Sequence, residues 1–235
     1  MQQTSLLLFI GFVIMALASL AIYLHGDKRR EFRHHTQFHA LVPFIAATAY
    51  LAMWLGTGNI AAPDGTPVFL ARYVDWSVTT PILLTGLLLT GLHEHPRHST
   101  YILPAIVLDV IMIVTGLLSA LAETDTARWI WFGWSCAAFV GVLWILWVPV
   151  RNIGEKLGGR LEDVYRGNLA FLTVVWLAYP VVAAIGIEGL GLVTLPAETA
   201  VFLALDVIAK VVYGFVATAR FKKVPGREER EASPA

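Results

Sequence analysis

The sequence predicts an all-α membrane protein, built as a bundle of seven transmembrane helices. Of its 235 residues, 57% are hydrophobic and only 14% are charged, and the mean hydropathy is +0.68. Soluble domains carry roughly a quarter charged residues, and 17 basic plus 17 acidic side chains are too few to coat a soluble surface of this size. The third observation is a series of seven long apolar stretches with short connections.

Each apolar stretch is long enough to span a membrane as a helix. A helix rises about 1.5 Å per residue and the hydrocarbon layer is about 30 Å thick. The expected spans are, in chain order, Ser5 to Leu24, Phe38 to Leu55, Val68 to Leu92, Tyr101 to Leu121, Trp129 to Val150, Leu169 to Ile187 and Thr199 to Ala219. The first stretch has its basic cluster after it and none before it, so we expect a retained helix rather than a signal peptide.

The distribution of basic residues predicts the orientation. Fourteen of the 17 lysines and arginines follow the first, third, fifth and seventh spans, which makes that side cytoplasmic by the positive-inside rule. The N-terminus is therefore expected outside and the C-terminus in the cytoplasm. We expect one membrane domain over residues 1–220 and a disordered cytoplasmic tail over residues 221–235, because the tail is charged and lacks an apolar period.

Charge and cysteine content exclude several classes of function. The formal net charge is zero, which gives no basic excess for a nucleic-acid partner. Cys136 is the single cysteine, so the chain has neither an intrachain disulfide nor a cysteine-based zinc cluster, and we propose no metal site. The partner that the composition predicts is the lipid bilayer.

Ionisable side chains inside the spans indicate a functional site. Each costs several kcal/mol in a membrane unless it is paired. Asp206 and Lys210 are four residues apart on one helical face, and Arg72, Asp75 and Thr79 form a stripe on another span. A buried ion-pair network that only fixes helix register is the alternative, but cheaper polar residues could do that. Four ionisable residues lie well inside the spans: Asp75, Asp109, Asp206 and Lys210.

A lysine in an apolar interior is a candidate for Schiff-base chemistry with a carbonyl ligand. The surrounding spans offer large apolar side chains, so the ligand is expected to be long and apolar, although each aromatic ring taken singly is more often simple packing. These side chains are Trp76, Leu83, Met112, Phe132, Phe139, Trp176 and Tyr179.

Four segments resemble a known family. The segments are ARYVDWSVTTPILL at 71–84, LDVIMIVTGL at 108–117, WLAYPVV at 176–182 and LDVIAKV at 205–211. They resemble helices three, four, six and seven of the bacteriorhodopsin-like microbial (type 1) rhodopsins, and the resemblance extends over all seven spans in order. It implies an all-trans retinal bound to Lys210 as a protonated Schiff base, with Asp75 as proton acceptor and counterion and Asp206 as second counterion.

The same resemblance implies further roles, residue by residue. Thr79 would donate a hydrogen bond to the acceptor, Arg72 would gate the outward path, and Glu188 with Glu198 would release the proton outside. Thr80 and Asp109 would form a hydrogen-bonded pair that keeps Asp109 protonated and structural. The other positions implied to surround the chromophore are Tyr50, Trp76, Leu83, Met112, Gly116, Phe132, Ser135, Phe139, Trp176, Tyr179, Pro180 and Ala183.

The chain departs from the family pattern at three positions. Phe132 and Ala183 replace tryptophans near the ring end of retinal, and because Phe132 fills a position that antenna-binding relatives keep as glycine, we expect no carotenoid antenna. Gly86 stands where the pumps carry a carboxylic proton donor, about 16 Å from Asp75 toward the cytoplasm. Asp75, Thr79 and Gly86 resemble the DTG subgroup of bacterial rhodopsins, which pump protons outward without that donor.

Because Gly86 cannot supply a proton to the Schiff base, two other sources of that proton remain open. An imidazole at His39, near the cytoplasmic start of the second span, can exchange protons near neutral pH. Alternatively, His39 is an interfacial histidine and water delivers the proton directly.

The resemblance implies a light-driven outward proton pump of a bacterial cell membrane, not an enzyme, and we expect a homo-oligomer. The alternative function is a sensory rhodopsin that signals through a transducer, although Ala209 stands where some sensors carry a hydroxyl. A halide pump is disfavoured by the charged Asp75, and a sodium pump by the absence of its Asn-Asp-Gln pattern. Leu83, Ser135 and Ala209 resemble green-absorbing members.

Overall fold

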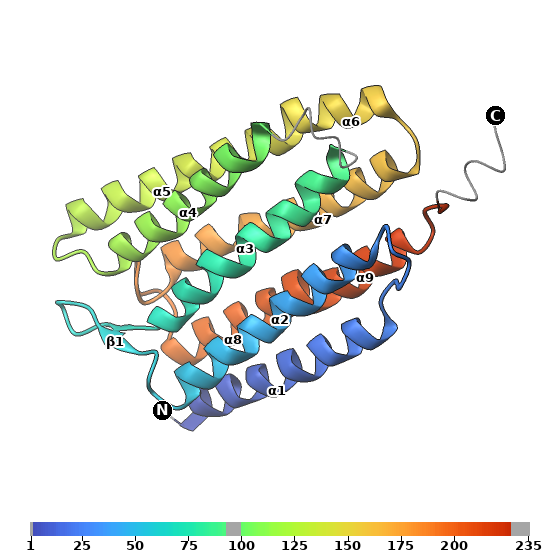
Figure 1. The fold of residues 1–235 in the computed structure, drawn as a ribbon. Coiled ribbons are helices and arrows are strands. Elements are labelled where there is room, and N and C mark those ends of the chain that lie inside the picture. The colour runs from blue at the N-terminus through green and yellow to red at the C-terminus, as the bar shows by residue number, and fades with distance from the viewer. Residues whose placement is uncertain (1, 93–99, 227–235) are drawn as a thin grey trace.

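A computed structural model of the chain describes residues 2–92 and 100–226. Within them, seven helical rods form one bundle, which confirms the predicted fold class (Figure 1). The rods are α1 (Gln2–His25), α2 (Arg33–Trp54), α3 (Leu70–Gly91), α4 (Ile102–Ala120), α5 (Asp125–Ile145) continued by η2 (Leu146–Val150) and α6 (Arg151–Leu157), α7 (Arg160–Ile185), and α8 (Leu195–Asp206) continued by η3 (Val207–Val212) and α9 (Tyr213–Phe221).

The two ends of the bundle differ. One end carries the start of α1 and a two-stranded antiparallel hairpin, β1 (Ile60–Ala61) with β2 (Pro67–Val68), and we call it the hairpin end. The other end carries the α1–α2 connection and the end of α9, and we call it the tail end (Figure 1). The sequence did not predict the hairpin, and the expected start of the third span at Val68 is wrong, because Val68 pairs with Ile60. Gly65 turns the chain between the strands at φ +85°, where a side chain would be strained.

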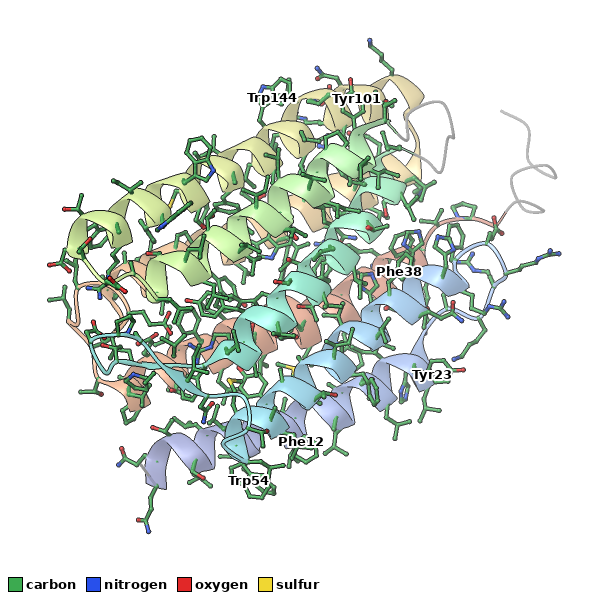
Figure 2. All side chains as sticks on the ribbon, turned by 60° about the vertical axis from the view of Figure 1, so that its left-hand side comes forward. Phe12, Tyr23, Phe38, Trp54, Tyr101 and Trp144 are labelled. Carbon is green, nitrogen blue, oxygen red and sulfur yellow. The ribbon has the colours of Figure 1, made fainter. Side chains whose placement is uncertain are left out.

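The apolar surface of the bundle faces outward. Val174 is 73% exposed and Leu103 69%, and Trp144 projects from α5 on the outside of the bundle (Figure 2). Among the described residues, six helices are long and apolar enough to cross a membrane. The polar residues of α3, Arg72 and Asp75 among them, are buried inside the bundle and lower its hydropathy. The protein is therefore a multi-pass membrane protein whose ionisable groups lie inside and whose apolar groups face lipid.

The tail half of the bundle is tightly packed. Leu84, Leu88, Leu146 and Leu169 are fully buried in one cluster, and Tyr165 donates its hydroxyl to the carbonyl of Leu146 at 2.5 Å. A close-packed interior of this kind holds few voids. The side chains that could surround a ligand therefore lie nearer the hairpin end.

Several helices are longer than the predicted apolar stretches. The second rod begins at Arg33 rather than Phe38, and the sixth at Arg160 rather than Leu169, because the helix continues past the apolar segment into charged residues.

Within the described part of the chain, two rods contain a wide, π-helical turn. The turn η2 contains Pro149, which lacks the N–H needed for an α-helical bond. The second wide turn, η3, contains Lys210.

The predicted tail boundary falls one residue before the end of α9. Arg29 donates to the carbonyls of Phe221 and Val224 at 2.9 and 2.7 Å, so the chain is held by the α1–α2 connection past residue 220. The basic residues Arg97, Arg227 and Arg230, and the expected disorder of residues 227–235, lie outside the described residues. The orientation of the termini in the membrane stays a prediction.

Candidate functional site: a buried lysine between two aspartates

Lys210 lies in the interior of the bundle, in the wide helical turn η3. Its side chain is 2% exposed. The amine Nζ contacts Asp75 Oδ2 and lies 3.3 Å from Asp206 Oδ1. Buried charges need paired and hydrogen-bonded partners, and two carboxylates around one amine leave this site with a formal negative charge before other groups are counted.

Asp75 reaches the amine from α3. Its carboxylate is fully enclosed, and none of the described residues is a hydrogen-bond partner of its Oδ1 atom. Thr79, one turn along the same helix, donates its hydroxyl to the backbone carbonyl of Asp75 at 2.8 Å, the usual bond of a threonine inside a helix. A bond from Thr79 to the carboxylate itself stays a prediction.

Asp206 reaches the amine from the last residue of α8. Tyr50 of α2 donates to Asp206 Oδ2 and Tyr179 of α7 donates to Asp206 Oδ1, each at 2.8 Å. Three helices therefore fix this carboxylate, whereas Asp75 keeps one oxygen without a donor among the described residues. The two aspartates therefore differ in the hydrogen bonds that hold them.

A pocket extends from Lys210 between α3, α4, α5 and α7. Every residue predicted to surround the chromophore lines it, apart from Tyr50, which bonds Asp206 instead. The predicted residues that line it are Trp76, Thr80, Leu83, Asp109, Met112, Gly116, Phe132, Ser135, Phe139, Trp176, Tyr179, Pro180, Ala183 and Lys210. The structure thus gathers residues from five rods around one apolar space that ends at a buried amine.

Several polar side chains in the pocket wall are bonded to each other or to the backbone. Thr80 of α3 contacts Asp109 Oδ2 of α4 at 2.6 Å, so these two predicted partners do meet. Ser135 donates to the carbonyl of Met112 at 2.7 Å, which joins α5 to α4. These bonds fix the helices that form the walls of the pocket.

Arg72 lies one turn from Asp75 toward the hairpin end. Its side chain is 4% exposed, and its guanidinium lies over the ring of Phe202 at 4.4 Å and the ring of Phe69 at 5.0 Å. Nη1 is 3.9 Å from Glu198 Oε1. The guanidinium is therefore held by a carboxylate and by two aromatic faces, each favourable for a cation.

Glu188 and Glu198 are held separately at the hairpin end. Tyr73 donates to Glu188 Oε2 at 2.5 Å, and the backbone N–H of Ile187 donates to Glu198 Oε2 at 2.8 Å. Burial raises the pKa of the Glu188 carboxyl above its ordinary value of 4.5, and the Glu198 charge adds to this, while Arg72 and Tyr73 oppose it. A proton can be held on this carboxyl at a higher pH than on an exposed glutamate.

His39 lies on α2 toward the tail end and is 3% exposed. Its ring meets Tyr213 edge-on at 5.3 Å and lies 6.5 Å from the ring of Phe221. Neither ring nitrogen has a hydrogen-bond partner among the described residues. The imidazole is therefore enclosed between helices, and whether it or water supplies the proton stays a prediction.

Sequence reasoning missed four residues that complete these contacts. They are Tyr73, which bonds Glu188; Phe202, whose ring lies under the Arg72 guanidinium and at a tilt to Trp76; and Tyr213 with Phe221, whose rings lie beside His39. Each reads in the sequence as an ordinary apolar or aromatic helix residue. Only Tyr73, adjacent to Arg72 in a polar segment, gave any signal.

The residues present fit retinal as the bound group. A long polyene aldehyde needs an amine at the end of an elongated apolar pocket, and Lys210 supplies it among aromatic walls. Trp76 and Trp176 both line the space. Asp75 Oδ1, for which the described residues offer no donor, is an acceptor next to the amine.

Comparisons with known proteins agree on one family. The family described as bacteriorhodopsin-like protein matches residues 2–224. Archaerhodopsin-2 from Halobacterium sp. (strain aus-2) is 38% identical over 92% of this chain and 84% of its own length. The thermophilic rhodopsin from Rubrobacter xylanophilus superposes with a TM-score of 0.87 at 36% identity, covering 93% of this chain and 96% of that one. A rhodopsin from Coccomyxa subellipsoidea, described as a light-driven proton pump, gives 0.84 at 33% identity, covering 93% and 97%.

Proposed function

Because the chain belongs to the bacteriorhodopsin-like protein family, we propose that it is a light-driven outward proton pump with all-trans retinal on Lys210. The observation that carries the proposal is the Lys210 amine, buried at the end of an apolar pocket and flanked by Asp75 and Asp206. Rhodopsins described as light-driven proton pumps from Coccomyxa subellipsoidea and Leptosphaeria maculans support it. Pumping involves no classical enzyme activity.

When bound to Lys210 through an imine, retinal supplies visible absorption and a nitrogen-bound proton that light can make available for transfer. Asp75 is placed to receive a proton from the Lys210 nitrogen, because Oδ2 contacts that atom and Oδ1 has no donor among the described residues. Asp206 is placed as the second counterion, because it lies 3.3 Å from the Lys210 nitrogen and is held there by hydrogen bonds from Tyr50 and Tyr179. In this proposal, Asp75 takes up and gives away the proton and Asp206 remains beside the nitrogen as its second partner.

The outward path leads through Arg72 to the glutamates of the hairpin end. Arg72 lies between Asp75 and Glu198, and a guanidinium that moves away from Asp75 strengthens its hold on Glu198. A cation nearer to the carboxylates favours their ionised form, which releases a proton on that side. We propose that Glu188 and Glu198 hold and release it.

The inward path lacks a carboxylic donor at Gly86. We propose that His39 supplies the proton, since its imidazole is enclosed within the tail half of the bundle and carries two free ring nitrogens as far as the described residues show. Direct delivery by water is the alternative. The two are distinguished by the His39 variant described in the Discussion.

A photosensor is the second candidate. The absence of a carboxylate at Gly86 favours it, since a sensor tolerates a slow cycle whereas a pump needs rapid refilling. Ala209 provides no hydroxyl beside Lys210 for signalling, which favours the pump. We further propose a bacterial cell membrane as location, a homo-oligomeric assembly and no carotenoid antenna.

The proposal is tested by illuminating cells that express the protein with added retinal while external pH is recorded. A pump acidifies the medium, and a protonophore abolishes the change. A coloured protein that leaves external pH unchanged contradicts pumping and supports the sensor. Lys210→Ala is the matched control, because it removes the imine and should remove both colour and acidification.

A further inference from the structure

The pocket continues past the space around Lys210 toward the hairpin end. Along α5, its lining residues run from Val142 to Arg128, which is about 21 Å of helix. The part nearest the hairpin end, which we call the outer arm, is bordered by Ser119, Ala120, Arg128, Ala183, Glu188 and Gly189. Small side chains at Ala120 and Ala183 leave this arm open where larger ones would close it.

Most polar groups around the pocket already have partners. Ser119 donates to the carbonyl of Arg128 at 2.8 Å, and Tyr73 donates to Glu188 at 2.5 Å. Two buried donors in the pocket wall lack an acceptor among the described residues: Trp76 Nε1 on α3, and Arg128 Nε, which belongs to the outer arm. A buried donor without an acceptor costs free energy, so an arrangement that supplies one is favoured.

The charge of Arg128 is already more than compensated by two carboxylates. Nη1 lies 2.9 Å from Asp125 Oδ1 and Nη2 lies 2.9 Å from Asp64 Oδ2, in the loop between β1 and β2. A third carboxylate would add repulsion, whereas a neutral oxygen would complete the hydrogen bonding of the guanidinium. The acceptor that fits Nε is therefore a hydroxyl or carbonyl oxygen.

The position of Arg128 suits the far end of the chromophore. Phe132, in the pocket wall where the ring of retinal is expected, is one turn along α5 from Arg128, about 6 Å along the axis. An arginine side chain spans that distance. An oxygen on the ring would point into the outer arm, beside Ala183.

We propose that the outer arm makes this pocket selective for a retinal whose ring bears an oxygen, with Arg128 Nε donating to that oxygen. The inference rests on the proposed function, because it assumes that retinal bonds to Lys210. It assigns to Arg128 and Ala183 a role in choosing the chromophore, separate from proton transfer.

The test is a competition for the purified retinal-free protein. Equal amounts of all-trans-retinal and all-trans-3-hydroxyretinal are added together, and in a parallel sample the second aldehyde is all-trans-4-oxoretinal. The bound chromophores are then released as oximes and quantified by chromatography. A hydrogen bond from a charged donor predicts about tenfold enrichment of at least one oxygenated aldehyde over retinal, and the two samples tell whether hydroxyl or carbonyl is preferred.

Two variants locate the preference. Arg128→Lys keeps a cation beside Asp64 and Asp125 but removes Nε, and Ala183→Trp fills the arm; each should bring the bound ratio close to the supplied ratio. The ratio is measured within each variant, so lower overall yield does not affect it. Equal binding by the unmodified protein, or an unchanged preference in Arg128→Lys, would overturn the inference while leaving the proposed function standing. No visible band with any of these aldehydes would overturn both.

Discussion

A Cβ atom placed on Gly86 would lie 3.7 Å from Phe38 Cδ2, an ordinary van der Waals contact. Figure 2 shows Phe38 on α2, facing the neighbouring rod α3. The position at which the resemblance leads us to expect a carboxylic donor in proton pumps is therefore lined by an aromatic ring but not filled by it.

Gly86→Asp should consequently fit and act as an internal donor. We expect reprotonation of the Lys210 nitrogen after a flash to become about tenfold faster or more, and less dependent on the pH of the cytoplasmic side. The measurement is the decay of the deprotonated pigment by transient absorption. Gly86→Asn is the matched control, since it has the same shape without a transferable proton; equal acceleration in both would show that packing, not proton donation, is responsible.

His39→Gln should slow the same step by about tenfold or more if the imidazole donates. The rise of the deprotonated pigment should be unaffected, because Asp75 lies on the other side of the amine. His25→Gln, an exposed histidine of the tail end, is the control. Unchanged decay in His39→Gln would assign uptake to water instead.

Glu188→Gln should change how stability depends on pH. Because burial raises the pKa of Glu188 above 4.5, folding favours its protonated form; the resulting stability is present at acid pH and is lost as pH rises through the folded-state pKa. As pH rises, the melting temperature of Glu188→Gln should therefore increase relative to that of the unmodified protein. Melting temperatures across a pH series measure this, with the exposed Glu123→Gln as control; a constant difference at all pH values would contradict it.

Asp27→Asn should weaken the tail end. Asp27 is 5% exposed and accepts from the backbone N–H and the guanidinium of Arg29, which in turn donates to the carbonyls of Phe221 and Val224. We expect the free energy of unfolding to fall by about 1–3 kcal/mol at neutral pH. Glu155→Gln, from an exposed pair with Arg151, should cost less than about 1 kcal/mol.

The loss of unfolding free energy in Asp27→Asn should depend on pH in a defined direction. Burial raises the pKa of Asp27, but the hydrogen bonds and charge of Arg29 outweigh it and hold the pKa below 3.8. Its stabilisation is therefore present above pH 3.8 and disappears as pH falls through the folded-state pKa. Melting curves of Asp27→Asn and the unmodified protein should converge in acid; a gap that persists there would mean that the charge is not what matters.

The sequence predicted the bundle because lipid imposes long apolar helices, and it predicted the pocket because buried charges and a specific motif mark it. It could not predict where helices extend past the bilayer, as at Arg33 and Arg160, since charged residues are good helix formers in water. The hairpin of Ile60 with Val68 escaped because two-residue strands have no periodicity to detect.

At the level of the site, the charged residues and the pocket-lining residues were predicted, whereas the aromatic partners of Glu188, Arg72 and His39 were missed. Tyr73 and Phe202 depend on which face of a helix meets which neighbour, and the apolar pattern does not give that rotation. Thr79 illustrates the same limit, because the spacing to Asp75 does not say whether the backbone or the carboxylate receives its hydroxyl.

The wide turn around Lys210 has a consequence for how this chain tolerates length changes. A π-helical turn holds about one extra residue per turn relative to an α-helix, so removing one residue other than Lys210 from Val207–Val212 restores α-helical geometry and leaves the following helix in phase. The edge contact of Tyr213 with His39 is then kept. A deletion in the regular helix α8 has no such slack, and it rotates Lys210 and every later residue by about 100° relative to the residues before it. The turn that carries Lys210 is therefore where this rod can absorb a change of one residue.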